Sequence, residues 1–440
     1  MNKKQVSRRG FIQGASAVAA ASPYLIPSGV LAQDGQPGAN DKIGVAGIGI
    51  GRQGSGDMNG AKGSSDVRIV GVADVNLPRA QSMNERFGGQ VAVQNYHEIL
   101  ERDDVDAIIT ATPDHWRAIV SVHAAQAGKD IYAEKPMTLT ILEGRRMAQA
   151  VRKYDCVFQT GAQQRSHPVN RYGCELVRNK RIGEIKSVEG ANYPSPWYGN
   201  LPAQPIPDGL DWDMWCGPTE PVPYNIDLYT PRANPGWISF TPYSGGEVTG
   251  WGAHGLDQIQ WALGMDETGP VEIWTEGDAL VPPTIEGSHP RSAGEVPCRE
   301  PIVCYKYANG IEVRLDKGNQ GGAIFYGTEA KLEIFRSRVT SNPSEIVEVP
   351  IRDDEIHLYE SGNQMRNWLD CIKSRERCIS DVEIGHRSST VCHLVNIVRL
   401  LGRPLKWDPE KEIFPGDDEA NSYIDRDRRA GYELPTEAEV

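Results

Sequence analysis

The sequence of 440 residues predicts an α/β protein of two domains, the first built on a doubly wound parallel sheet and the second, an α+β domain, on a mostly antiparallel sheet. In residues 41–157, short β-branched runs alternate with helical segments, which is typical of a parallel sheet. Beyond Cys156, strand-like segments follow one another across short turns with few helices between them, which favours antiparallel pairing. The length itself exceeds what one hydrophobic core usually organises.

The first part of the chain has the three features of a twin-arginine signal peptide. Arg8 and Arg9 stand in Ser-Arg-Arg-Gly-Phe-Ile, and a short, weakly apolar core includes Ala15–Ala21. Val30-Leu31-Ala32 has the small-x-small form that a signal peptidase reads. We therefore expect residues 1–32 to be removed after the twin-arginine machinery has exported the folded protein.

A short linker, residues 33–40, is expected between this signal peptide and the first domain. No other stretch approaches the roughly 18 apolar residues needed to cross a bilayer, so we expect a soluble, periplasmic protein with no membrane partner after processing. The alternative for the N-terminus is an arginine pair on a solvated tail.

Composition limits the partners of the chain. The formal net charge of -13 opposes binding to nucleic acid and to anionic membranes, and a neutral substrate fits this charge better. The 8 cysteines are too sparse for a disulfide framework, and Cys371 and Cys378 lack the paired spacing of a zinc site. Buried free thiols and no bound metal are therefore expected.

The first predicted strand leads into a glycine-rich turn. Lys42–Ala46 is a short β-branched run, and residues 47–54 read Gly-Ile-Gly-Ile-Gly-Arg-Gln-Gly, an order typical of strand, turn and helix. Glycines let the backbone approach a pyrophosphate, and the start of a helix offers unpaired N–H groups and the positive end of its dipole. The third glycine of the usual spacing falls on Arg52, with Gly51 and Gly54 beside it.

The second predicted strand indicates which dinucleotide is bound. Val67–Ala73 ends at Asp74, where an acidic side chain can accept hydrogen bonds from both ribose hydroxyls of the adenosine half. Because a carboxylate there would repel a 2′-phosphate, NAD is predicted in preference to NADP, with Arg79 as the residue able to reverse this choice. The alternative is a doubly wound domain that has lost its ligand.

Two further strand ends continue the pattern. Val105–Thr112 predicts a buried parallel strand that runs into Thr-Pro-Asp-His-Trp at 112–116, and a helix is expected at Arg117–Ala127. Gly128–Ala133 predicts the next strand, which leads directly into Glu-Lys-Pro at 134–136. Since ligands bind at the carboxyl ends of such strands, both segments are expected beside the cofactor.

In this order, the glycine turn, the aspartate after the second strand, Thr-Pro-Asp-His-Trp and Glu-Lys-Pro resemble the Gfo/Idh/MocA oxidoreductases, a family named for glucose-fructose oxidoreductase, inositol dehydrogenase and a rhizopine-catabolism protein. The resemblance extends through residues 161–165, 245–257 and 407–409 and is closest to the exported branch from environmental bacteria. It implies an N-terminal Rossmann domain, residues 41–157, and an α+β domain, residues 158–402, with an open, mostly antiparallel sheet.

The second half of the sequence agrees with this implication. Strands are expected at Ile185–Asn192, Val271–Glu276, Ile302–Tyr307, Ile311–Leu315 and Lys331–Phe335, and two late helices near Asn363–Lys373 and Ile384–Leu401. The resemblance implies a homo-oligomer, a dimer or tetramer, formed through the open sheet. Residues 403–440 are expected to pack on the core as a C-terminal tail.

Oxidation of a secondary alcohol needs a nicotinamide over the carbon and a group that takes the hydroxyl proton. The resemblance implies Lys135 and His254 for this chemistry. A partly desolvated lysine at a strand end has a lowered pKa and can exchange protons, whereas the alternative is a salt bridge with a nearby acid. His254 is expected to act as a base or to orient a sugar hydroxyl, against the alternative of a structural histidine.

The sequence departs from the family's pattern four residues before this histidine. Many relatives carry an aspartate there, while this chain has Gly250. Either Glu247 or Asp257 replaces the missing carboxylate, or the chemistry has changed. Because Asp257 follows His254 by three residues, a helix would bring both to one face, and we predict Asp257 as the catalytic partner. A helix cap or an ion pair is the alternative for Asp257.

Other predicted contacts surround the cofactor and the substrate. The cofactor contacts are Gly47, Gly49, Gly51, Arg52, Gln53, Asp74, Thr112, Pro113, His115, Glu134, Lys135 and Gln163. The substrate contacts are Arg165, Arg171, Tyr193, Trp197, Trp237 and His254. Trp212 and Trp215 are expected instead to fill a core or cover a loop.

Export constrains the mechanism that these residues suggest. A periplasmic enzyme has no assured pool of free nucleotide, so NAD is expected to cross in the folded protein and to stay tightly bound. The enzyme must then restore its own NAD, by reducing a second sugar or by returning the hydride to the same substrate after an elimination, hydration or epimerisation step. We expect an NAD(P)-dependent oxidoreductase, or a redox-neutral glycosidase, lyase or epimerase, for a sugar or glycoside; the alternative is a noncatalytic sugar-binding or scaffold protein.

Overall fold

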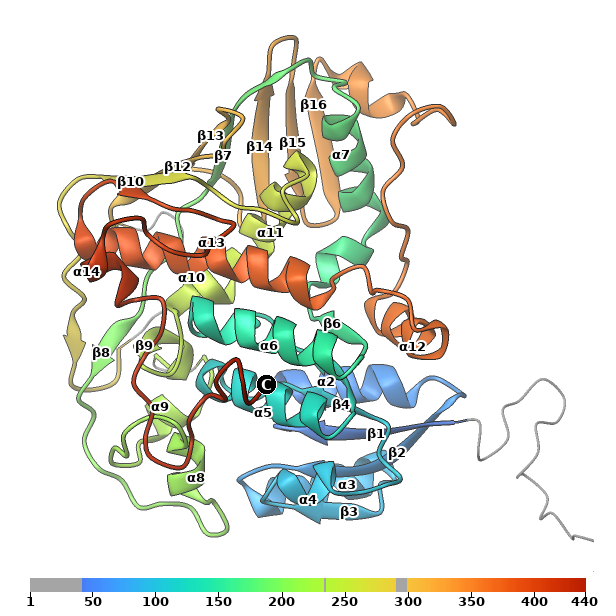
Figure 1. Cartoon of the computed structure of the whole chain (residues 1–440), viewed down its shortest axis with the longest axis vertical. Coiled ribbons are helices and arrows are strands. Elements are labelled where there is room, and N and C mark those ends of the chain that lie inside the picture. The colour runs from blue at the N-terminus through green and yellow to red at the C-terminus, as the bar shows by residue number, and fades with distance from the viewer. Residues whose placement is uncertain (1–41, 233–234, 290–298) are drawn as a thin grey trace, which may run out of the picture.

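The computed structural model describes residues 42–232, 235–289 and 299–440. The predicted signal peptide, residues 1–32, and the predicted linker, residues 33–40, lie outside the described residues. Two sheets organise the molecule, one toward each end of its long axis, with helices around and between them (Figure 1).

The N-terminal sheet has six parallel strands in the order β3-β2-β1-β4-β5-β6. Its strands are β1 (Ile43–Ile48), β2 (Val67–Ala73), β3 (Val91–Val93), β4 (Ala107–Thr110), β5 (Asp130–Ala133) and β6 (Phe158–Thr160). The helices between them are α2 (Arg52–Lys62), α3 (Leu77–Phe87), α4 (His97–Leu100), α5 (Asp114–Gln126) and α6 (Ile141–Lys153). The predicted Rossmann domain is confirmed.

Both faces of this sheet are buried, which explains the β-branched composition of its strands. All six residues of β1 are buried, with Ile48 in one hydrophobic cluster and Val45 in another on the opposite face. The first cluster includes residues of α5 and α6. The second includes residues of α2 and of α12 (Gln364–Ser374), one of the predicted late helices, which therefore covers the N-terminal sheet.

The C-terminal sheet has eight strands in the order β16-β15-β14-β7-β13-β12-β10-β17. Neighbours are antiparallel except β7 and β13, which pair in parallel. The strands are β7 (Ile185–Ala191), β10 (Glu272–Glu276), β12 (Ile302–Lys306), β13 (Glu312–Asp316), β14 (Gly322–Gly327), β15 (Lys331–Phe335), β16 (Arg338–Asn342) and β17 (Leu405–Lys406). This confirms the open, mostly antiparallel sheet; β14, β16 and β17 were not predicted.

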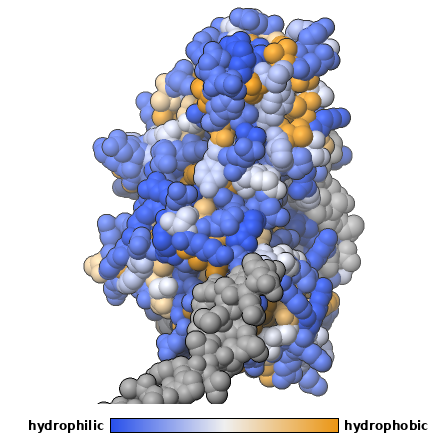
Figure 2. Space-filling model, turned by 90° about the vertical axis from the view of Figure 1, so that its right-hand side faces the viewer, coloured by the Kyte–Doolittle hydropathy of each residue, from blue (hydrophilic) through white to orange (hydrophobic). Residues whose placement is uncertain are grey.

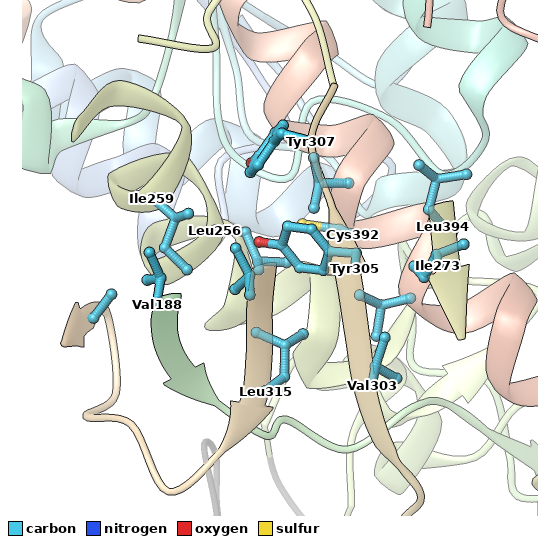
Figure 3. Packing of buried hydrophobic residues seen from close by; sticks show 14 of the residues in the cluster. Val188, Leu256, Ile259, Ile273, Val303, Tyr305, Tyr307, Leu315, Cys392 and Leu394 are labelled. Carbon is cyan, nitrogen blue, oxygen red and sulfur yellow. The ribbon is translucent and has the colours of Figure 1, made fainter. Parts of the chain in front are cut away.

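Three helices cover the inner face of this sheet: α7 (Pro168–Arg178), α11 (Gly252–Leu263) and α13 (Val382–Leu401). Figure 3 shows Leu256 and Ile259 of α11 beside Val188 of β7, and Cys392 of α13 beside Tyr305 of β12. Full burial of such side chains contributes about 1.5–3 kcal/mol each. This packing holds α11, which carries His254, firmly against the sheet.

Short elements between β7 and α11 form a lobe beside the N-terminal domain. They are β8 (Trp197–Gly199), α8 (Trp212–Cys216), α9 (Ile226–Tyr229), β9 (Phe240–Thr241) and α10 (Gly246–Gly250), and β11 (Thr284–Ile285) completes a three-stranded sheet. Single 3-10 turns are η2 (Gln163–Ser166), η3 (Trp237–Ser239) and, later in the chain, η4 (Ser344–Glu348). Trp212 stacks on Trp215 at 4.4 Å in the aromatic core of this lobe, as expected for core residues.

The C-terminal tail contacts both domains. It contains α14 (Asp418–Asn421), and its Glu412 pairs with Arg145 of α6 at 2.6 Å. Arg426 and Arg428 of the tail form ion pairs with Glu143 of α6, at 3.1 and 3.0 Å. The chain ends next to α5, on the N-terminal domain (Figure 1). Residues 403–440 thus join the two domains by ion pairs.

Hydrophilic residues cover most of the face that Figure 2 shows, and hydrophobic ones are scattered among them, most densely near its upper end. Among the helices of the described ranges, none combines the length and the apolar character that crossing a membrane requires. The cysteines in the part of the chain that the structure describes are buried and free.

Candidate active site

A cavity of about 950 Å³ opens at the carboxyl edge of the N-terminal sheet. Its lining runs from Asp74, after β2, past Thr112, after β4, to Glu134 and Lys135, after β5. The opposite side belongs to the second domain and includes His254. Two domains therefore enclose one elongated space.

The glycine turn at one end of the cavity leaves room for a phosphate group. Gly49 has a φ of +78°, and a Cβ there would lie 2.8 Å from the backbone N of Thr112, so only glycine fits. Gly51 precedes α2, no side chain caps this helix, and no atom lies within 4 Å of the Cβ position of Gly51. The first N–H groups of α2 consequently face open space, as pyrophosphate binding requires.

Three predicted cofactor residues of this turn differ in their placement. Arg52 and Gln53 line the cavity together with Gly49 and Gly51. Gly47 lies outside the lining, and a Cβ there would collide with Ile50 and Met58, so the absence of a side chain at Gly47 serves packing. The prediction of Gly47 as a cofactor contact is corrected accordingly.

Asp74 lies at the mouth of the cavity and supports the turn. Its carboxylate accepts hydrogen bonds from the backbone N–H of Ile50 and of Asn76, both at 2.9 Å. Arg79 reaches the same carboxylate at 3.5 Å and stacks over Tyr229, with 5.3 Å from its guanidinium carbon to the ring centroid. This end fits the adenosine ribose, because an acceptor carboxylate lines it.

The segment after β4 contributes less than predicted. Thr112 and Pro113 line the cavity, whereas His115 lies in the first turn of α5 and is only 1% exposed. Its Nε2 lies 2.9 Å from the carbonyl oxygen of Trp215, and burial lowers the pKa of His115 to about 3. His115 therefore joins α5 to α8, which corrects its assignment as a cofactor contact.

A cluster of acidic and amide side chains forms the floor near β5. Gln163 donates to Glu134 at 2.5 Å, and Gln53 donates to Asp57 at 3.0 Å and to Glu134 at 3.4 Å. Burial, followed by the field of Glu134, raises the pKa of Asp57 to about 8. Burial also raises the pKa of Glu134. Asp57 was missed in the sequence, since an acid in the second turn of a helix carries no special signal.

Lys135 projects into the cavity from the end of β5. Its Nζ donates to the carbonyl oxygen of Gly250 at 3.3 Å, and no carboxylate in the described ranges forms an ion pair with it. Burial lowers the pKa of Lys135, and the positive charge of Arg232 acts in the same direction against the opposing field of Glu134. A lysine in this state exchanges protons more readily than an exposed one.

His254 faces Lys135 across the cavity from the first turn of α11. It is 7% exposed, and its ring lies edge-on to Trp251 with 5.9 Å between ring centroids. Burial lowers the pKa of His254 well below its usual value, and the charges of Lys135, Arg336 and Arg232 lower it further. The imidazole is therefore neutral at pH 7 and can take part in hydrogen bonds as an uncharged ring.

Glu247 occupies the space that Gly250 leaves empty. A Cβ at Gly250 would lie 2.8 Å from Oε2 of Glu247 and 3.1 Å from Nη2 of Arg232. Arg232 holds the Glu247 carboxylate through two hydrogen bonds of 3.0 and 3.2 Å. Of the two carboxylates expected to replace the family aspartate, Glu247 is the one next to Gly250, and it lies behind the residues that line the cavity.

Asp257, predicted as the catalytic partner, lies in a buried ion-pair network instead. Its carboxylate accepts hydrogen bonds from Arg165 at 2.7 to 3.0 Å and from Ser388 at 2.7 Å, and Arg165 also pairs with Asp266 at 2.7 Å. Arg165 is 1% exposed, and neither it nor Asp257 lines the cavity. Both assignments are corrected: the guanidinium and carboxylate neutralise each other inside the second domain.

Three other predicted substrate contacts lie away from the cavity. Arg171 pairs with Glu175 at 2.8 Å within α7, and the Tyr193 hydroxyl accepts a hydrogen bond from the backbone N–H of Gly321 at 2.6 Å. Trp197 belongs to β8 and packs in the aromatic lobe. Trp237 does line the cavity, and so does Trp215.

The structure adds residues that sequence reasoning missed. Arg232, Trp251 and Arg336 line the second-domain side of the cavity. Arg336 comes from the turn between β15 and β16, and no motif marks it. Within the described ranges, no group of three or more histidine, cysteine, aspartate or glutamate side chains is arranged to hold a metal ion.

Family models match most of the chain. Residues 42–162 match the model described as an oxidoreductase family, NAD-binding Rossmann fold. Residues 181–434 match the model described as an oxidoreductase family, C-terminal alpha/beta domain. The two matches coincide with the two structural domains that enclose the cavity.

Two individual relatives share less than a third of their aligned residues with this chain. Myo-inositol 2-dehydrogenase of Thermotoga maritima is 22% identical over 297 residues, which are 68% of this chain and 73% of that protein. Levoglucosan dehydrogenase of Pseudarthrobacter phenanthrenivorans is 29% identical over 126 residues, which are 29% of this chain and 32% of that protein.

Solved structures share the fold. An aldose-aldose oxidoreductase from Caulobacter crescentus, complexed with glycerol, superposes with a TM-score of 0.59 at 16% identity, over 83% of this chain and 99% of that one. A levoglucosan dehydrogenase in complex with NADH and L-sorbose superposes with a TM-score of 0.58 at 17% identity, over the same two shares. At such identities, the likeness shows the fold alone.

Proposed function

Because the chain belongs to the Gfo/Idh/MocA oxidoreductase family, we propose that it is a periplasmic, NAD-binding oxidoreductase that acts on a sugar or glycoside. One observation carries this proposal: a single cavity joins an uncapped helix start at Gly51 to Lys135 and the neutral His254. The names of two relatives, a myo-inositol and a levoglucosan dehydrogenase, support a polyhydroxylated ring as the substrate.

The first half of the cavity would hold the nucleotide. NAD supplies, when bound, the centre that accepts or returns a hydride. The N–H groups at the start of α2 would bind its pyrophosphate, and Asp74 would accept hydrogen bonds from the adenosine ribose. The carboxylate of Asp74 supports NAD over NADP, since Arg79, the cation able to receive a 2′-phosphate, is already engaged with it.

The second half would hold the sugar against Lys135 and His254. The lowered pKa of Lys135, kept in place by the carbonyl of Gly250, favours its role as the acceptor of the hydroxyl proton, and the neutral ring of His254 would orient that hydroxyl by a hydrogen bond. Glu247 and Arg232 form an ion pair next to Lys135. Arg232, which lines the cavity and is held by Glu247, would orient the substrate hydroxyls, in place of the aspartate that many relatives carry at the position of Gly250.

We further propose that the nucleotide stays bound through each cycle. The twin arginines of residues 8 and 9 support export of the folded chain with its cofactor. A second sugar would then be reduced, or the hydride returned to the same substrate after elimination, hydration or epimerisation.

A homo-oligomer is proposed through the open face of the large sheet. Ile324 and Tyr326 alternate with the fully buried Phe325 along β14, so they point to the opposite face, and each is only half-buried there. Partly exposed apolar side chains on an uncovered sheet favour contact with a second copy.

The proposal is tested by purifying the exported protein without added nucleotide and analysing the small molecules released on denaturation. We expect close to one NAD per chain, reduced by sugars in a nicotinamide absorbance assay. A folded protein that retains no nucleotide and needs millimolar NAD would contradict the tightly bound cofactor. Sugar binding without any absorbance change would favour a noncatalytic sugar-binding protein.

A further inference from the structure

Arg336 brings a positive charge to the substrate end of the cavity. It occupies the turn between β15 and β16, lines the cavity and is exposed. Its guanidinium carbon lies 4.8 Å from the centroid of the Trp251 ring, on which it stacks. Among the residues that the structure describes, Arg336 has neither an ion-pair partner nor a hydrogen-bond acceptor.

Two other cations line the same side of the cavity. Arg232 is paired with Glu247, and within the described ranges the Nζ of Lys135 donates to the carbonyl oxygen of Gly250. All three cations lower the pKa of His254, next after burial, so a positive field extends across the site. The carboxylate of Glu247 pairs with Arg232, and Glu134 acts on Lys135 through its field.

We propose that the substrate is an acidic sugar, and that Arg336 binds its carboxylate, phosphate or sulfate group while the sugar ring faces Lys135 and His254. The inference rests on the proposed function and names the class of sugar. A guanidinium presents parallel N–H donors that match such anions. Because Arg336 is already stacked on Trp251, its side chain loses less conformational entropy when it binds an anion. Because Arg336 has no carboxylate partner among the described residues, a bound anion would add a charge-assisted contact that a neutral sugar cannot supply.

The position of Arg336 separates this anion from the phosphates of the nucleotide. The uncapped start of α2 lies in the N-terminal domain, whereas Arg336 lies on the C-terminal sheet beside Trp251 and His254. The formal net charge of -13 favours a neutral substrate, but that charge is summed over the whole chain. Because salt screens distant charges, the charge nearest the substrate group matters most, and at this end of the cavity that charge is the guanidinium of Arg336.

The test compares acidic and neutral sugars by calorimetry on the purified protein with whatever nucleotide it carries. The panel consists of methyl glycosides of glucuronic, galacturonic and mannuronic acid, the matching neutral hexosides, and the 6-phosphates and 6-sulfates of the hexoses. We expect at least one acidic sugar to bind about ten- to a hundredfold more tightly than its neutral counterpart. Comparison of uronates, phosphates and sulfates identifies which anion is recognised.

Variants of the β15–β16 turn assign the preference to one side chain. Arg336→Met should remove the preference without weakening the neutral sugar, and Arg336→Lys should keep part of it. Arg338→Met is the matched control, because Arg338 pairs with Glu333 at 3.5 Å outside the cavity. Equal binding of acidic and neutral sugars, binding of neither, or a preference that survives in Arg336→Met would overturn the inference.

Failure of the inference and failure of the proposed function give different results. A protein that retains NAD and oxidises neutral sugars, with no preference for acids, contradicts the role of Arg336 alone. A protein that binds acidic sugars through Arg336 but retains no nucleotide contradicts the redox function alone.

Discussion

At the scale of single residues, the charged side chains of the site differ in whether they form an ion pair. Asp257 and Glu247 are each neutralised by an arginine, Arg165 and Arg232 respectively. The Nζ of Lys135, by contrast, donates to the carbonyl oxygen of Gly250 and has no ion-pair partner in the part of the chain that the structure describes, and burial lowers its pKa. We therefore assign the proposed chemistry to Lys135 and to His254, whose ring is neutral.

Replacement of Lys135 by methionine tests its role as a proton acceptor. Lys135→Met keeps the length of the side chain but removes the amine, so bound NAD should remain and turnover should fall by about 10²- to 10⁴-fold. Retained nucleotide is measured by absorbance after denaturation, and turnover by the change in nicotinamide absorbance. Lys153→Met, on the exposed face of α6, is the control. Near-normal turnover in Lys135→Met would refute the assignment.

A second prediction concerns the carboxylate that stands in for the family aspartate. Gly250→Asp alone should destabilise the protein by about 1–3 kcal/mol, because its Cβ meets Glu247 at 2.8 Å and two carboxylates then share one space. In the double variant Gly250→Asp with Glu247→Ala, the Glu247 side chain no longer clashes with the new aspartate. The aspartate can then pair with Arg232 in place of Glu247. The melting temperature and turnover of the double variant should exceed those of Gly250→Asp, and a double variant worse than either single change would contradict this account.

Lys135 and His254, predicted for proton transfer, both line the cavity, whereas Asp257, predicted as their acidic partner, does not. Lys135 and His254 stand in motifs whose local order is informative. The spacing of three residues between His254 and Asp257 indicates only that both side chains lie on one side of α11. It contains no information on Arg165, which lies 92 residues earlier in the chain and captures the Asp257 carboxylate. Such competition is decided by tertiary packing.

At the scale of elements, the start of α2 is the part on which cofactor binding depends most. Its first N–H groups remain free only if the preceding turn keeps its left-handed residue, Gly49. The same helix contains Gly56, which is exposed and has no neighbour within 4 Å of its Cβ position. One element thus offers a glycine that is required and one that is not.

Alanine at these two glycines should have opposite effects. Gly49→Ala places a Cβ 2.8 Å from the backbone of Thr112 at a φ of +78°, so it should cost more than about 1 kcal/mol and release the nucleotide. Gly56→Ala should instead raise stability by about 0.5–1 kcal/mol, because alanine favours the helix. Melting temperature and bound nucleotide measure both effects, and equal behaviour of the two variants would contradict the proposed turn geometry.

The helices and strands predicted from the sequence agree with the structure where the signal lies within the segment itself, as a run of apolar residues or a turn motif. The strands of the parallel sheet are buried on both faces and so are apolar throughout, which made them recognisable. β16, by contrast, is an edge strand of alternating exposed and half-buried residues, and its polar sequence carries no such signal. The hairpin of β15 and β16 was therefore not predicted, and Arg336 in its turn could not be assigned to the cavity.

At the scale of the whole molecule, buried neutral histidines couple stability to pH. Burial lowers the pKa of His115 to about 3 and that of His393 to about 4, from the usual 6.5 of a histidine. The unfolded chain takes up these protons below about pH 6.5, while the folded chain does not. Each histidine thus contributes stability above that pH that is lost as the pH falls toward its folded pKa, about 2 kcal/mol each at pH 5.

His393 allows this coupling to be measured. Its Nε2 lies 3.1 Å from the hydroxyl of Thr138, a contact that glutamine can reproduce. Between pH 7 and pH 5, His393→Gln should lose about 2 kcal/mol less unfolding free energy than the unmodified protein in urea titrations. His357→Gln, at an exposed position, should follow the unmodified protein. An identical pH dependence in His393→Gln would show that His393 is protonated in the folded state.

The central claim is that a nicotinamide dinucleotide lies in the cavity between the two domains. A crystal structure of the protein purified without added nucleotide tests it most directly. The account predicts electron density that runs continuously from the N–H groups after Gly51, past Asp74 at the adenosine end, to a nicotinamide ring within reach of Lys135. Density showing the cavity closed by side chains, or a nucleotide bound elsewhere, would contradict it.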